Sequence, residues 1–464
     1  MRLTAEWIAS ATGGRVIAGA RGQAFETVSI DTRTLQAGAL YVGIRGERFD
    51  GADFAEAAIQ AGAAGVLVPG GWSGRRRGAA GGVVIEVDDT TTALQALGHA
   101  VRRESGAKVV AITGSAGKTT TKEITAEFLS ARYRVMRNRG NFNNHIGLPL
   151  SLTELTARPE VAVVELGMNH AGEIRTLVGI AEPDVRVWTN VGEAHVGFFA
   201  SVDAIADAKA EILEGATRST VLVANADDPR ISKRIGQFIG RVVTFGLDAD
   251  SDVHARAIVD RGIDGTRADV TTPSGEIELK TPLVGRGNLA NVLAATAVAL
   301  EFDVPLQIIA ERAAVLQPAS HRGEVVRLAN GVTVIDDSYN ANPTATRRAL
   351  EVLATSSSAT RRIAVLGEML ELGNHATALH EDVGRAAAAG VNLLLTVGGD
   401  AAAAMAEAAV TAGLPRDRVK HFGTSDEAAA AIADLVKPGD LVLVKGSRGV
   451  RTDRVVDRLK GEPR

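Results

Sequence analysis

A short glycine loop between an apolar run and a helical run constrains this chain more than any other feature. The apolar, β-branched run Val109–Thr113 leads into Gly114–Gly117, and Lys118–Thr120 opens a helical pattern over residues 120–131. A strand, a glycine turn and a helix start in this order place backbone N–H groups and a helix N-terminus around phosphates. We therefore expect an α/β nucleotide-binding unit built around this loop.

The loop is shorter than the common pattern G-x-x-x-x-G-K-[ST]. Its first glycine is Gly114, whereas the common spacing would require a glycine at Ile112. Lys118 can still bring a positive charge to the β- and γ-phosphates, and Thr119 a hydroxyl to Mg²⁺. A chance Gly-Lys-Thr in a surface turn is disfavoured, because this one follows a buried-type strand and precedes a helix.

Composition narrows the class of protein. The chain has 464 residues, a net charge of −4 and no cysteine. This length predicts several domains, the charge gives no basic field for nucleic acid or anionic membranes, and thiol chemistry is excluded. We see no signal peptide and no apolar run near the roughly 18 residues of a membrane span, so a cytoplasmic enzyme is expected. The glycine- and arginine-rich stretch Gly70–Gly78 could bind anions, but a solvated loop is the favoured interpretation.

The sequence pattern divides into three blocks, which we expect to be domains at residues 1–86, 87–316 and 317–464. The fold class is α/β: a small N-terminal α/β domain, a central doubly wound parallel sheet, and a C-terminal Rossmann-like domain. Alternation over His254–Leu283 predicts an antiparallel addition to the central sheet. The other expected strands are Thr27–Ile30, Ala39–Val42, Gly65–Val68, Val83–Val87, Lys108–Thr113, Val161–Leu166, Val185–Asn190, Thr220–Ala224, Val242–Phe245, Val332–Ile335, Arg362–Leu366, Leu393–Val397 and Leu441–Val444.

Several polar residues follow central strands, at the sheet edge that should carry the loop. Glu165 could hold nucleotide-bound Mg²⁺ or simply bond loop amides, and His195 could ligate a second metal or be an ordinary loop residue. Lys209 and Glu211 are two apart on a helix and cannot share a face, so the residues alone favour a solvated charged helix. The amide-rich segment Asn138–Pro149 is typical of turns, but it could also bind a polar substrate.

Taken together, these motifs resemble the Mur ligases, the ATP-dependent amide-forming enzymes of bacterial cell-wall synthesis, over essentially the whole chain. The resemblance implies that D-alanyl-D-alanine is joined to UDP-N-acetylmuramoyl-tripeptide through an acyl phosphate, with release of ADP and phosphate. Both substrates are small molecules, and a monomer is expected. The matching segments are Thr113–Thr120, Asn138–Pro149, Glu165–His170, Asp336–Pro343, Leu366–Gly373 and Val444–Gly449.

The resemblance also implies roles for individual residues. Lys118, Glu165, His195 and Lys209 would be catalytic, and Thr119, Glu165, His195 and a carbamylated Lys209 would bind two Mg²⁺ ions. ATP would be bound by Gly114, Ser115, Ala116, Gly117, Lys118, Thr119, Thr120, Asn288, Asn291, Arg322 and Asp337, with Asn291 at the adenine, Asp337 at the ribose and Arg322 at the γ-phosphate. Substrate contacts would come from Ser29, Asp31, Arg33, Arg45, Gly46, Asn141, Asn143, Asn144, Asn340, Asn342, Lys445, Ser447 and Arg448.

Two positions depart from the family pattern. The motif G-x-H-N-x-x-N reads Gly285–Asn291 here, with Gly287 in place of the histidine. The motif F-D-G-H reads Phe49–Ala52, so a second histidine is missing. Two other classes of function stay open at this point: a sister amide ligase such as a folylpolyglutamate synthase or another Mur enzyme, and a nucleotide-binding switch or scaffold that makes no amide.

Overall fold

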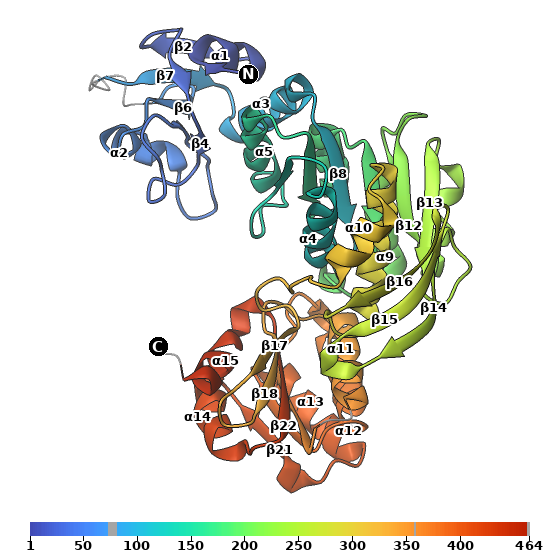
Figure 1. Cartoon of the computed structure of the whole chain (residues 1–464). Coiled ribbons are helices and arrows are strands. Elements are labelled where there is room, and N and C mark those ends of the chain that lie inside the picture. The colour runs from blue at the N-terminus through green and yellow to red at the C-terminus, as the bar shows by residue number, and fades with distance from the viewer. Residues whose placement is uncertain (73–80, 357–358, 462–464) are drawn as a thin grey trace.

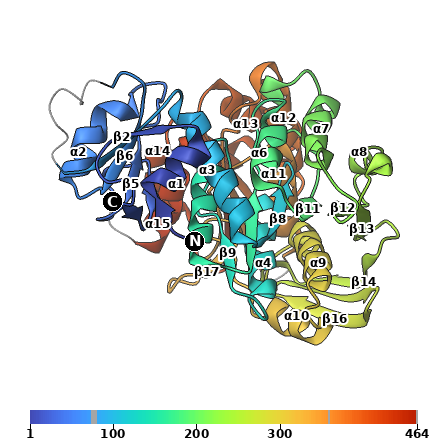
Figure 2. The same cartoon turned by 90° about the horizontal axis from the view of Figure 1, so that it is seen from above.

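The computed structural model describes residues 1–72, 81–356 and 359–461, which form three α/β bodies. We call them the first, central and third domains; the first and third lie on the same side of the central one (Figures 1 and 2). The expected three-domain α/β fold is confirmed, while the boundaries near residues 86 and 316 stay predictions. The stretch 73–80, which holds most of the loop expected at Gly70–Gly78, falls outside the described residues.

The first domain is built on a small sheet with the strand order β2-β7-β6-β5-β4. Strands β4 to β7 run parallel, and β2 pairs antiparallel with β7. Its core is aliphatic apart from Tyr41 and Phe25. The elements are β1 (Leu3–Thr4), α1 (Ala5–Thr12), β2 (Arg15–Ala18), β3 (Ala24–Phe25), β4 (Val28–Ser29), β5 (Leu40–Val42), α2 (Ala55–Gln60), β6 (Gly65–Pro69) and β7 (Val83–Val87).

The central domain holds a nine-stranded sheet in the order β16-β15-β14-β13-β12-β11-β8-β10-β9. Strands β8, β10, β11 and β12 are buried almost throughout and pair only with parallel neighbours, as expected for apolar runs covered on both faces. The parallel elements are α3 (Thr90–Ser105), β8 (Lys108–Thr113), α4 (Lys118–Leu129), β9 (Val135–Arg137), α5 (Gly147–Leu152), β10 (Val161–Glu165), α6 (Glu173–Ala181), β11 (Val185–Trp188), α7 (Val202–Ala210), β12 (Val221–Asn225), α8 (Pro229–Ser232) and β13 (Arg241–Gly246).

The antiparallel addition expected after His254 is confirmed. Strand β14 pairs parallel with β13 and antiparallel with β15, which in turn pairs antiparallel with β16. Helix α9 follows and packs against α4, so the helix after the phosphate loop and the helix after the addition lie side by side. These elements are β14 (Val253–Asp260), β15 (Thr266–Thr272), β16 (Gly275–Thr281), α9 (Arg286–Glu301) and α10 (Leu306–Ala313).

The third domain has a six-stranded sheet in the order β17-β18-β22-β19-β20-β21. All its pairs are parallel except the edge pair β17–β18. Within the described ranges, no helix has the length and apolar character to cross a membrane. The elements are β17 (Glu324–Arg327), β18 (Thr333–Asp337), α11 (Pro343–Thr355), β19 (Arg361–Gly367), α12 (Ala376–Ala388), β20 (Leu393–Val397), α13 (Asp400–Thr411), β21 (Val419–Phe422), α14 (Ser425–Leu435), β22 (Asp440–Lys445) and α15 (Asp453–Lys460).

Candidate active site

The phosphate loop has its shortened spacing for a steric reason. Gly114 and Gly117 both have positive φ, 154° and 80°. A Cβ at Gly114 would lie 2.0 Å from Oγ1 of Thr189, and one at Gly117 would lie 2.4 Å from Oδ1 of Asn291. Because no side chain fits at either position, two glycines three residues apart are what this compact turn requires.

The first half of the loop is tied to the loop that follows β11. The N–H of Ser115 donates to the Asn190 carbonyl (3.0 Å), and the N–H of Ala116 donates to Asn190 Oδ1 (2.9 Å). The hydroxyl of Ser115 donates to the Gly192 carbonyl at 3.1 Å. The N–H groups at residues 118–120 begin helix α4 and have no intrahelical acceptor. These amides, rather than those of Ser115 and Ala116, are therefore free to hold phosphate.

Two lysines converge on one carbonyl of this loop. Nζ of Lys118 donates to the Gly114 carbonyl at 2.8 Å, and Nζ of Lys209 donates to the same oxygen at 3.1 Å. Burial lowers the pKa of Lys118, and burial together with the nearby Lys118 charge holds the pKa of Lys209 well below its ordinary value. Burial therefore shifts Lys209 toward its neutral amine, and its side chain is almost fully enclosed by protein.

The expectation of a solvated helix around Lys209 and Glu211 is wrong. Lys209 is 1% exposed and Glu211 is 5% exposed. The Glu211 carboxylate accepts hydrogen bonds from the N–H groups of Gly172 (2.6 Å) and Arg175 (3.0 Å), at the start of helix α6. The two side chains do point different ways, as their spacing requires, but both point into protein.

Glu165 stands at the end of β10 beside the phosphate loop. Its Oε2 accepts a hydrogen bond from the Thr119 hydroxyl (2.7 Å), and its Oε1 accepts one from the Asn143 amide (2.8 Å). In the described part of the chain, no three His, Cys, Asp or Glu side chains group closely enough to hold a metal by themselves. A hydroxyl and a carboxylate oxygen in contact nevertheless fit Mg²⁺, which takes few protein ligands when phosphates and water supply the rest.

The amide-rich loop forms the expected turn, and part of it faces the cleft, where its expected contact with a polar substrate stays a prediction. Asn138 is buried, donates to the Phe142 carbonyl and accepts from the N–H of Glu165 at 3.0 Å. Asn144 Oδ1 accepts from the N–H of Gly147 at 2.8 Å. These two residues form the turn, whereas Asn143 reaches Glu165 and Asn141 lines the cleft described below.

His195 lies where the central and third domains meet. It has a left-handed backbone, with φ of 63°, and its Nδ1 lies 2.6 Å from Oε2 of Glu371. The hydrogen bond with His195 lowers the pKa of Glu371. The Glu371 carbonyl also accepts from the N–H of Gly197 at 3.0 Å. A predicted metal ligand is thus held by a carboxylate of another domain.

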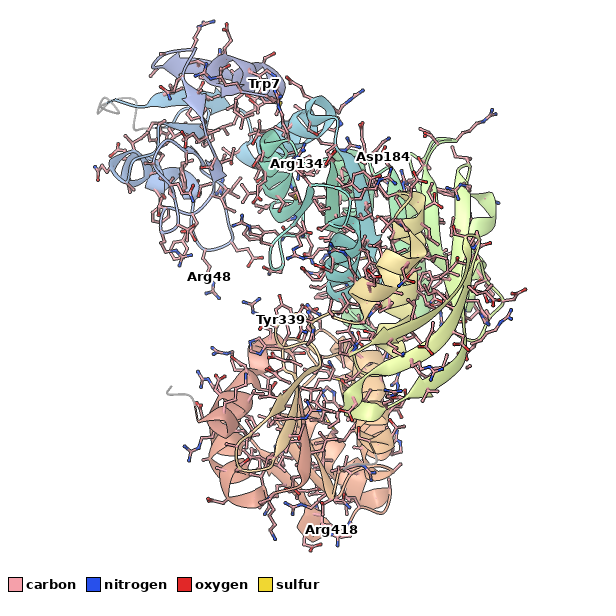
Figure 3. All side chains as sticks on the ribbon, viewed as in Figure 1. Trp7, Arg48, Arg134, Asp184, Tyr339 and Arg418 are labelled. Atoms are coloured by element: carbon pink, nitrogen blue, oxygen red, sulfur yellow. The ribbon has the colours of Figure 1, made fainter. Side chains whose placement is uncertain are left out.

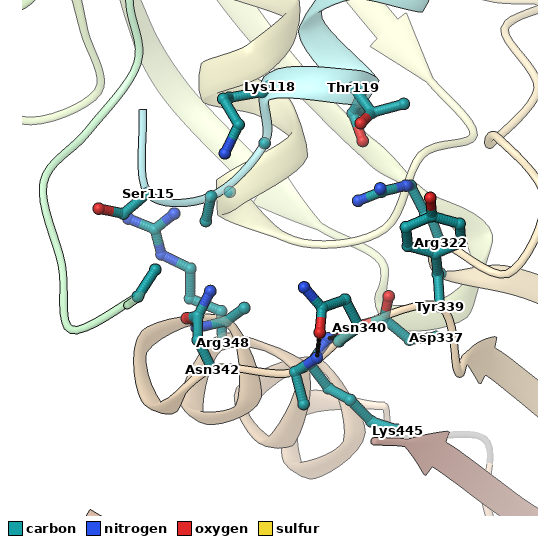
Figure 4. A pocket seen from close by; sticks show the side chains of 18 of the residues that line it. Ser115, Lys118, Thr119, Arg322, Asp337, Tyr339, Asn340, Asn342, Arg348 and Lys445 are labelled. Carbon is teal, nitrogen blue, oxygen red and sulfur yellow. Dashed lines mark hydrogen bonds and ion pairs between the residues drawn. The ribbon is translucent and has the colours of Figure 1, made fainter. Parts of the chain in front are cut away.

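The third domain presents cations and an aromatic ring to the loop (Figure 4). Nζ of Lys445 donates to Asp337 Oδ2 (2.6 Å) and to the Asn340 carbonyl (3.0 Å). The Arg322 guanidinium lies 4.2 Å from the centre of the Tyr339 ring, and Arg448 Nη1 donates to the Tyr339 hydroxyl at 3.3 Å. This group brings together β18, β22, the loops that follow them and, through Arg322, the segment before β17.

Two predicted substrate residues of the third domain already have structural partners. Oδ1 of Asn342 accepts from the N–H of Ala345 (2.9 Å), which caps the start of helix α11. Oγ of Ser447 accepts from the N–H of Leu370 at 2.9 Å. Their side chains therefore hold the shape of the cleft wall, whatever else they contact.

A cleft of about 820 Å³ joins these groups. Gly114 and Lys209 lie behind its wall, and the predicted first-domain residues Ser29, Asp31, Arg33, Arg45 and Gly46 do not line it. The predicted residues that do line it are Ser115, Ala116, Gly117, Lys118, Thr119, Thr120, Asn141, Asn143, Asn144, Glu165, His195, Asn288, Asn291, Arg322, Asp337, Asn340, Asn342, Lys445, Ser447 and Arg448.

The first-domain candidates form a separate group. Asp31 pairs with Arg33, with 2.6 Å between Oδ2 and Nη2, and hydrogen bonds from Arg33 lower the pKa of Asp31 to about 2. The hydroxyl of Ser29 accepts from the N–H of Asp31 at 3.2 Å. In the view of Figure 3, Arg48 lies at the edge of the first domain that faces the third domain, on the side where Tyr339 is labelled. The first domain therefore turns a basic side chain toward the side where the cleft's third-domain wall lies.

Sequence reasoning missed the residues that cross between the central and third domains. Glu193 accepts from Thr344 Oγ1, and from Arg347 Nη2 at 2.8 Å. Burial would raise the pKa of Glu193, but these two partners bring it below its usual value. No local sequence pattern predicts such contacts, because the partners are more than 150 positions apart. The one sequence feature that could have indicated a functional role for Glu193 is its position just past a strand.

Comparison with known proteins agrees with this geometry. Residues 24–102 match the model for the Mur ligase family, catalytic domain; residues 112–299 match the Mur ligase middle domain; and residues 321–448 match the Mur ligase, glutamate ligase domain. A UDP-N-acetylmuramoyl-tripeptide--D-alanyl-D-alanine ligase of Bacillus subtilis is 35% identical over 380 residues, 82% of each chain.

Solved structures show the same likeness. A crystal structure of MurF from Acinetobacter baumannii superposes with a TM-score of 0.88 at 31% identity, covering 100% of this chain and 99% of that one. MurF ligase from Thermotoga maritima in complex with ADP superposes with a TM-score of 0.81 at 28% identity, covering 94% and 97%.

Proposed function

The chain belongs to the Mur ligase family, and from that premise we propose that it joins D-alanyl-D-alanine to UDP-N-acetylmuramoyl-tripeptide at the expense of ATP, in peptidoglycan precursor synthesis. The observation that carries the proposal is the cleft itself. Lys118 and the start of α4 face Arg322, Asp337 and Lys445 across one space, and the activity of the relatives needs a nucleotide and a peptide side by side.

The reaction has two steps. A terminal carboxylate oxygen of the tripeptide attacks the γ-phosphorus, the bond to ADP breaks, and an acyl phosphate forms. The amine nitrogen of D-alanyl-D-alanine then attacks the acyl carbon, the C–O bond to phosphate breaks, and one amine proton is released. The protein's task is to position the reactants and to offset negative charge in both steps.

The loop wall supplies most of the charge compensation. Lys118 and the amides of residues 118–120 would hold the β- and γ-phosphates, and Arg322 would approach from the third domain. Mg²⁺ on Thr119 and Glu165 would add charge neutralisation and polarise the phosphate oxygens. Closure of the third domain would exclude the water that would otherwise hydrolyse the acyl phosphate.

Lys209 now has a physical basis for carbamylation. A neutral amine is the form that attacks CO₂, and burial beside Lys118 favours that form. The carbamate is an anion that would interact favourably with Lys118 and could ligate a second Mg²⁺ together with His195, once His195 leaves Glu371. The residues thus fit the two-ion arrangement, and we include it in the proposal.

The remaining parts of the proposal concern the first domain and the setting. We assign the uridine diphosphate part of the substrate to Ser29, Asp31, Arg33, Arg45 and Gly46, with Arg33 giving up part of its pairing with Asp31. A monomer acting in the cytoplasm completes the proposal. Size-exclusion chromatography with light scattering tests the monomer.

The decisive experiment measures ADP release by the purified full chain. UDP-N-acetylmuramoyl-tripeptides ending in diaminopimelate or in lysine are offered with and without D-alanyl-D-alanine, beside a folate with glutamate. We expect release that needs both the muramoyl-tripeptide and D-alanyl-D-alanine. Faster release with folate and glutamate would make it a sister amide ligase, and ADP release that ignores the amine would reject amide formation altogether.

A further inference from the structure

Arg348 is an arginine of the cleft lining to which the site described above assigns no function. It lies on helix α11 of the third domain and lines the cleft. Its neighbour Arg347 pairs with Glu193, but Arg348 makes no hydrogen bond or ion pair with any residue in the described ranges. Although its side chain reaches solvent, the surrounding protein lowers its pKa, against the charges of Glu351 and Asp228. The side chain is exposed in the cleft, so its N–H donors are open to water or to a ligand.

Arg348 lies directly across Gly287, at the start of helix α9. A Cβ built on Gly287 would be 3.4 Å from Cδ of Arg348 and 3.7 Å from its Nη1. The backbone of Gly287 does not have positive φ, so the turn itself does not require glycine there. The absence of a side chain instead leaves room for the stem of Arg348. The guanidinium extends past this point toward the phosphate loop at Ser115 (Figure 4).

The same helix start leads to the phosphate loop. Asn291, one turn after Gly287, has its Oδ1 against Gly117 and accepts from the Thr121 hydroxyl at 3.2 Å. Glu165 ends β10, on one side of β8, whereas Asp228 and the loop after β11 lie on the other side. A nucleotide that extends from Glu165 along the phosphate loop to Asn291 and Gly287 would meet Arg348 there.

We propose that Arg348 binds the nucleotide by covering a face of its purine base, in the space that Gly287 keeps open. A planar guanidinium stacks on aromatic rings and attracts their faces, which suits a base better than the phosphates. The phosphate end already has Lys118, Arg322 and the α4 amides. Arg348 is then a positioning and affinity residue that arrives with the third domain. This inference rests on the proposed use of ATP.

Direct binding tests the proposal without relying on turnover. Isothermal titration measures ADP and inorganic tripolyphosphate against the full chain, Arg348→Ala and Arg348→Lys. We expect Arg348→Ala to weaken ADP about ten-fold while leaving tripolyphosphate unchanged. Arg348→Lys should fall between the two, since an ammonium keeps the charge but not the flat stacking surface. Arg385→Ala is the matched control, because it removes the same charge from an exposed pair with Asp382 on α12.

The outcomes separate cleanly. Equal weakening of ADP and tripolyphosphate would make Arg348 a phosphate contact and overturn base stacking, and unchanged ADP affinity would remove it from the nucleotide site. Wild-type protein that binds no ADP would instead reject the proposed function on which the inference rests. Thermal melts of each variant, which should match wild type because Arg348 holds no protein partner, exclude misfolding as the cause of lost affinity.

Discussion

The two walls of the cleft hold their lysines in opposite ways. On the loop wall, Lys118 and Lys209 share only the Gly114 carbonyl, and in the described residues neither forms an ion pair with a carboxylate. On the third-domain wall, Lys445 is about as buried as Lys209, at 3% exposure against 1%, but it is paired with Asp337 at 2.6 Å. The two lysines of the loop wall therefore have no paired anion, and a ligand or a carbamate can supply one. Lys445 is already neutralised by Asp337, and this pair fixes the geometry of the third-domain wall.

Each wall is also held together from within its own domain. Asn190 ties the loop, and Asn138 and Asn143 hold Glu165, all inside the central domain. Few polar contacts cross between the walls, chiefly those of Glu193 and His195. This arrangement suits a third domain that moves as a body, because opening and closing would change only a small number of contacts while both walls keep their shape.

The largest expected effect is the loss of the unpaired loop cation. Lys118→Ala should lower ADP release about a thousand-fold or more, since nothing else on the loop wall can take over its charge at the β- and γ-phosphates. The measurement is a coupled ADP assay with both substrates saturating. Lys108→Ala removes a lysine from the exposed start of β8, the strand before the phosphate loop, where it pairs with Asp184. This variant should keep wild-type activity. Substantial ligation by the Lys118 variant would break the comparison between the walls.

The second prediction concerns the lysine behind the loop. Lys209→Ala should reduce ligation about a hundred-fold, and acetate or formate should restore part of it by replacing the carbamate charge. Wild-type protein in ¹³C-bicarbonate should show a carbamate carbon signal that Lys209→Ala lacks. Lys445→Ala is the contrasting variant: its lysine is paired, so short carboxylates should not rescue it. Full activity of unrescued Lys209→Ala would leave its burial without a catalytic meaning.

The outcome for Lys209 shows where sequence reasoning ends. Continuous apolar runs predicted the parallel strands, and parallel strands bring their carboxyl ends to one edge, so Glu165 and His195 could be placed beside the loop from topology. Burial of Lys209 depends on how helix α7 docks, which no local spacing encodes. The resemblance to a family, not the helix pattern, made Lys209 a candidate for the site, and its carbamylation stays a prediction.

The other features that the sequence did not predict are short strands and contacts between domains. Strands β1, β3 and β9 have two or three residues each, and β2, β17 and β21 have four each; these are too short for a clear periodic pattern, and none of the six was predicted. The roles of Glu371, Arg347 and Arg348 follow from contacts between domains, and their surroundings in the sequence carry no sign of the partner. The longer helices and strands could be predicted from the sequence, whereas the contacts between the central and third domains could not.

A smaller effect is expected from the contact between the walls. Glu193→Gln keeps the shape of the side chain but removes the charge that holds Arg347, so the closed arrangement should be populated less. We expect the KM for ATP to rise about three-fold to ten-fold with kcat nearly unchanged. Asp264→Asn, which breaks the exposed pair with Arg327, is the matched control between the same domains and should change neither constant. A fall in kcat alone would place Glu193 in the chemistry rather than in closure.

The smallest effect should appear in the acid stability of the third-domain wall. His380 is fully buried; its Nε2 accepts from the N–H of Met369 (2.9 Å), and its Nδ1 donates to the Ala376 carbonyl (2.7 Å). Burial lowers the pKa of His380, so as pH falls below about 6.5 the unfolded chain takes up the proton first and folded stability declines, with no such decline above that pH. His380→Gln can still accept from Met369 but cannot titrate, and its Tm should fall less than that of wild type between pH 7.5 and pH 5.5, by a few degrees.

His421→Gln, at the partly exposed edge strand β21, is the control and should follow the wild-type curve. Parallel curves for wild type and His380→Gln would assign the acid sensitivity to another group.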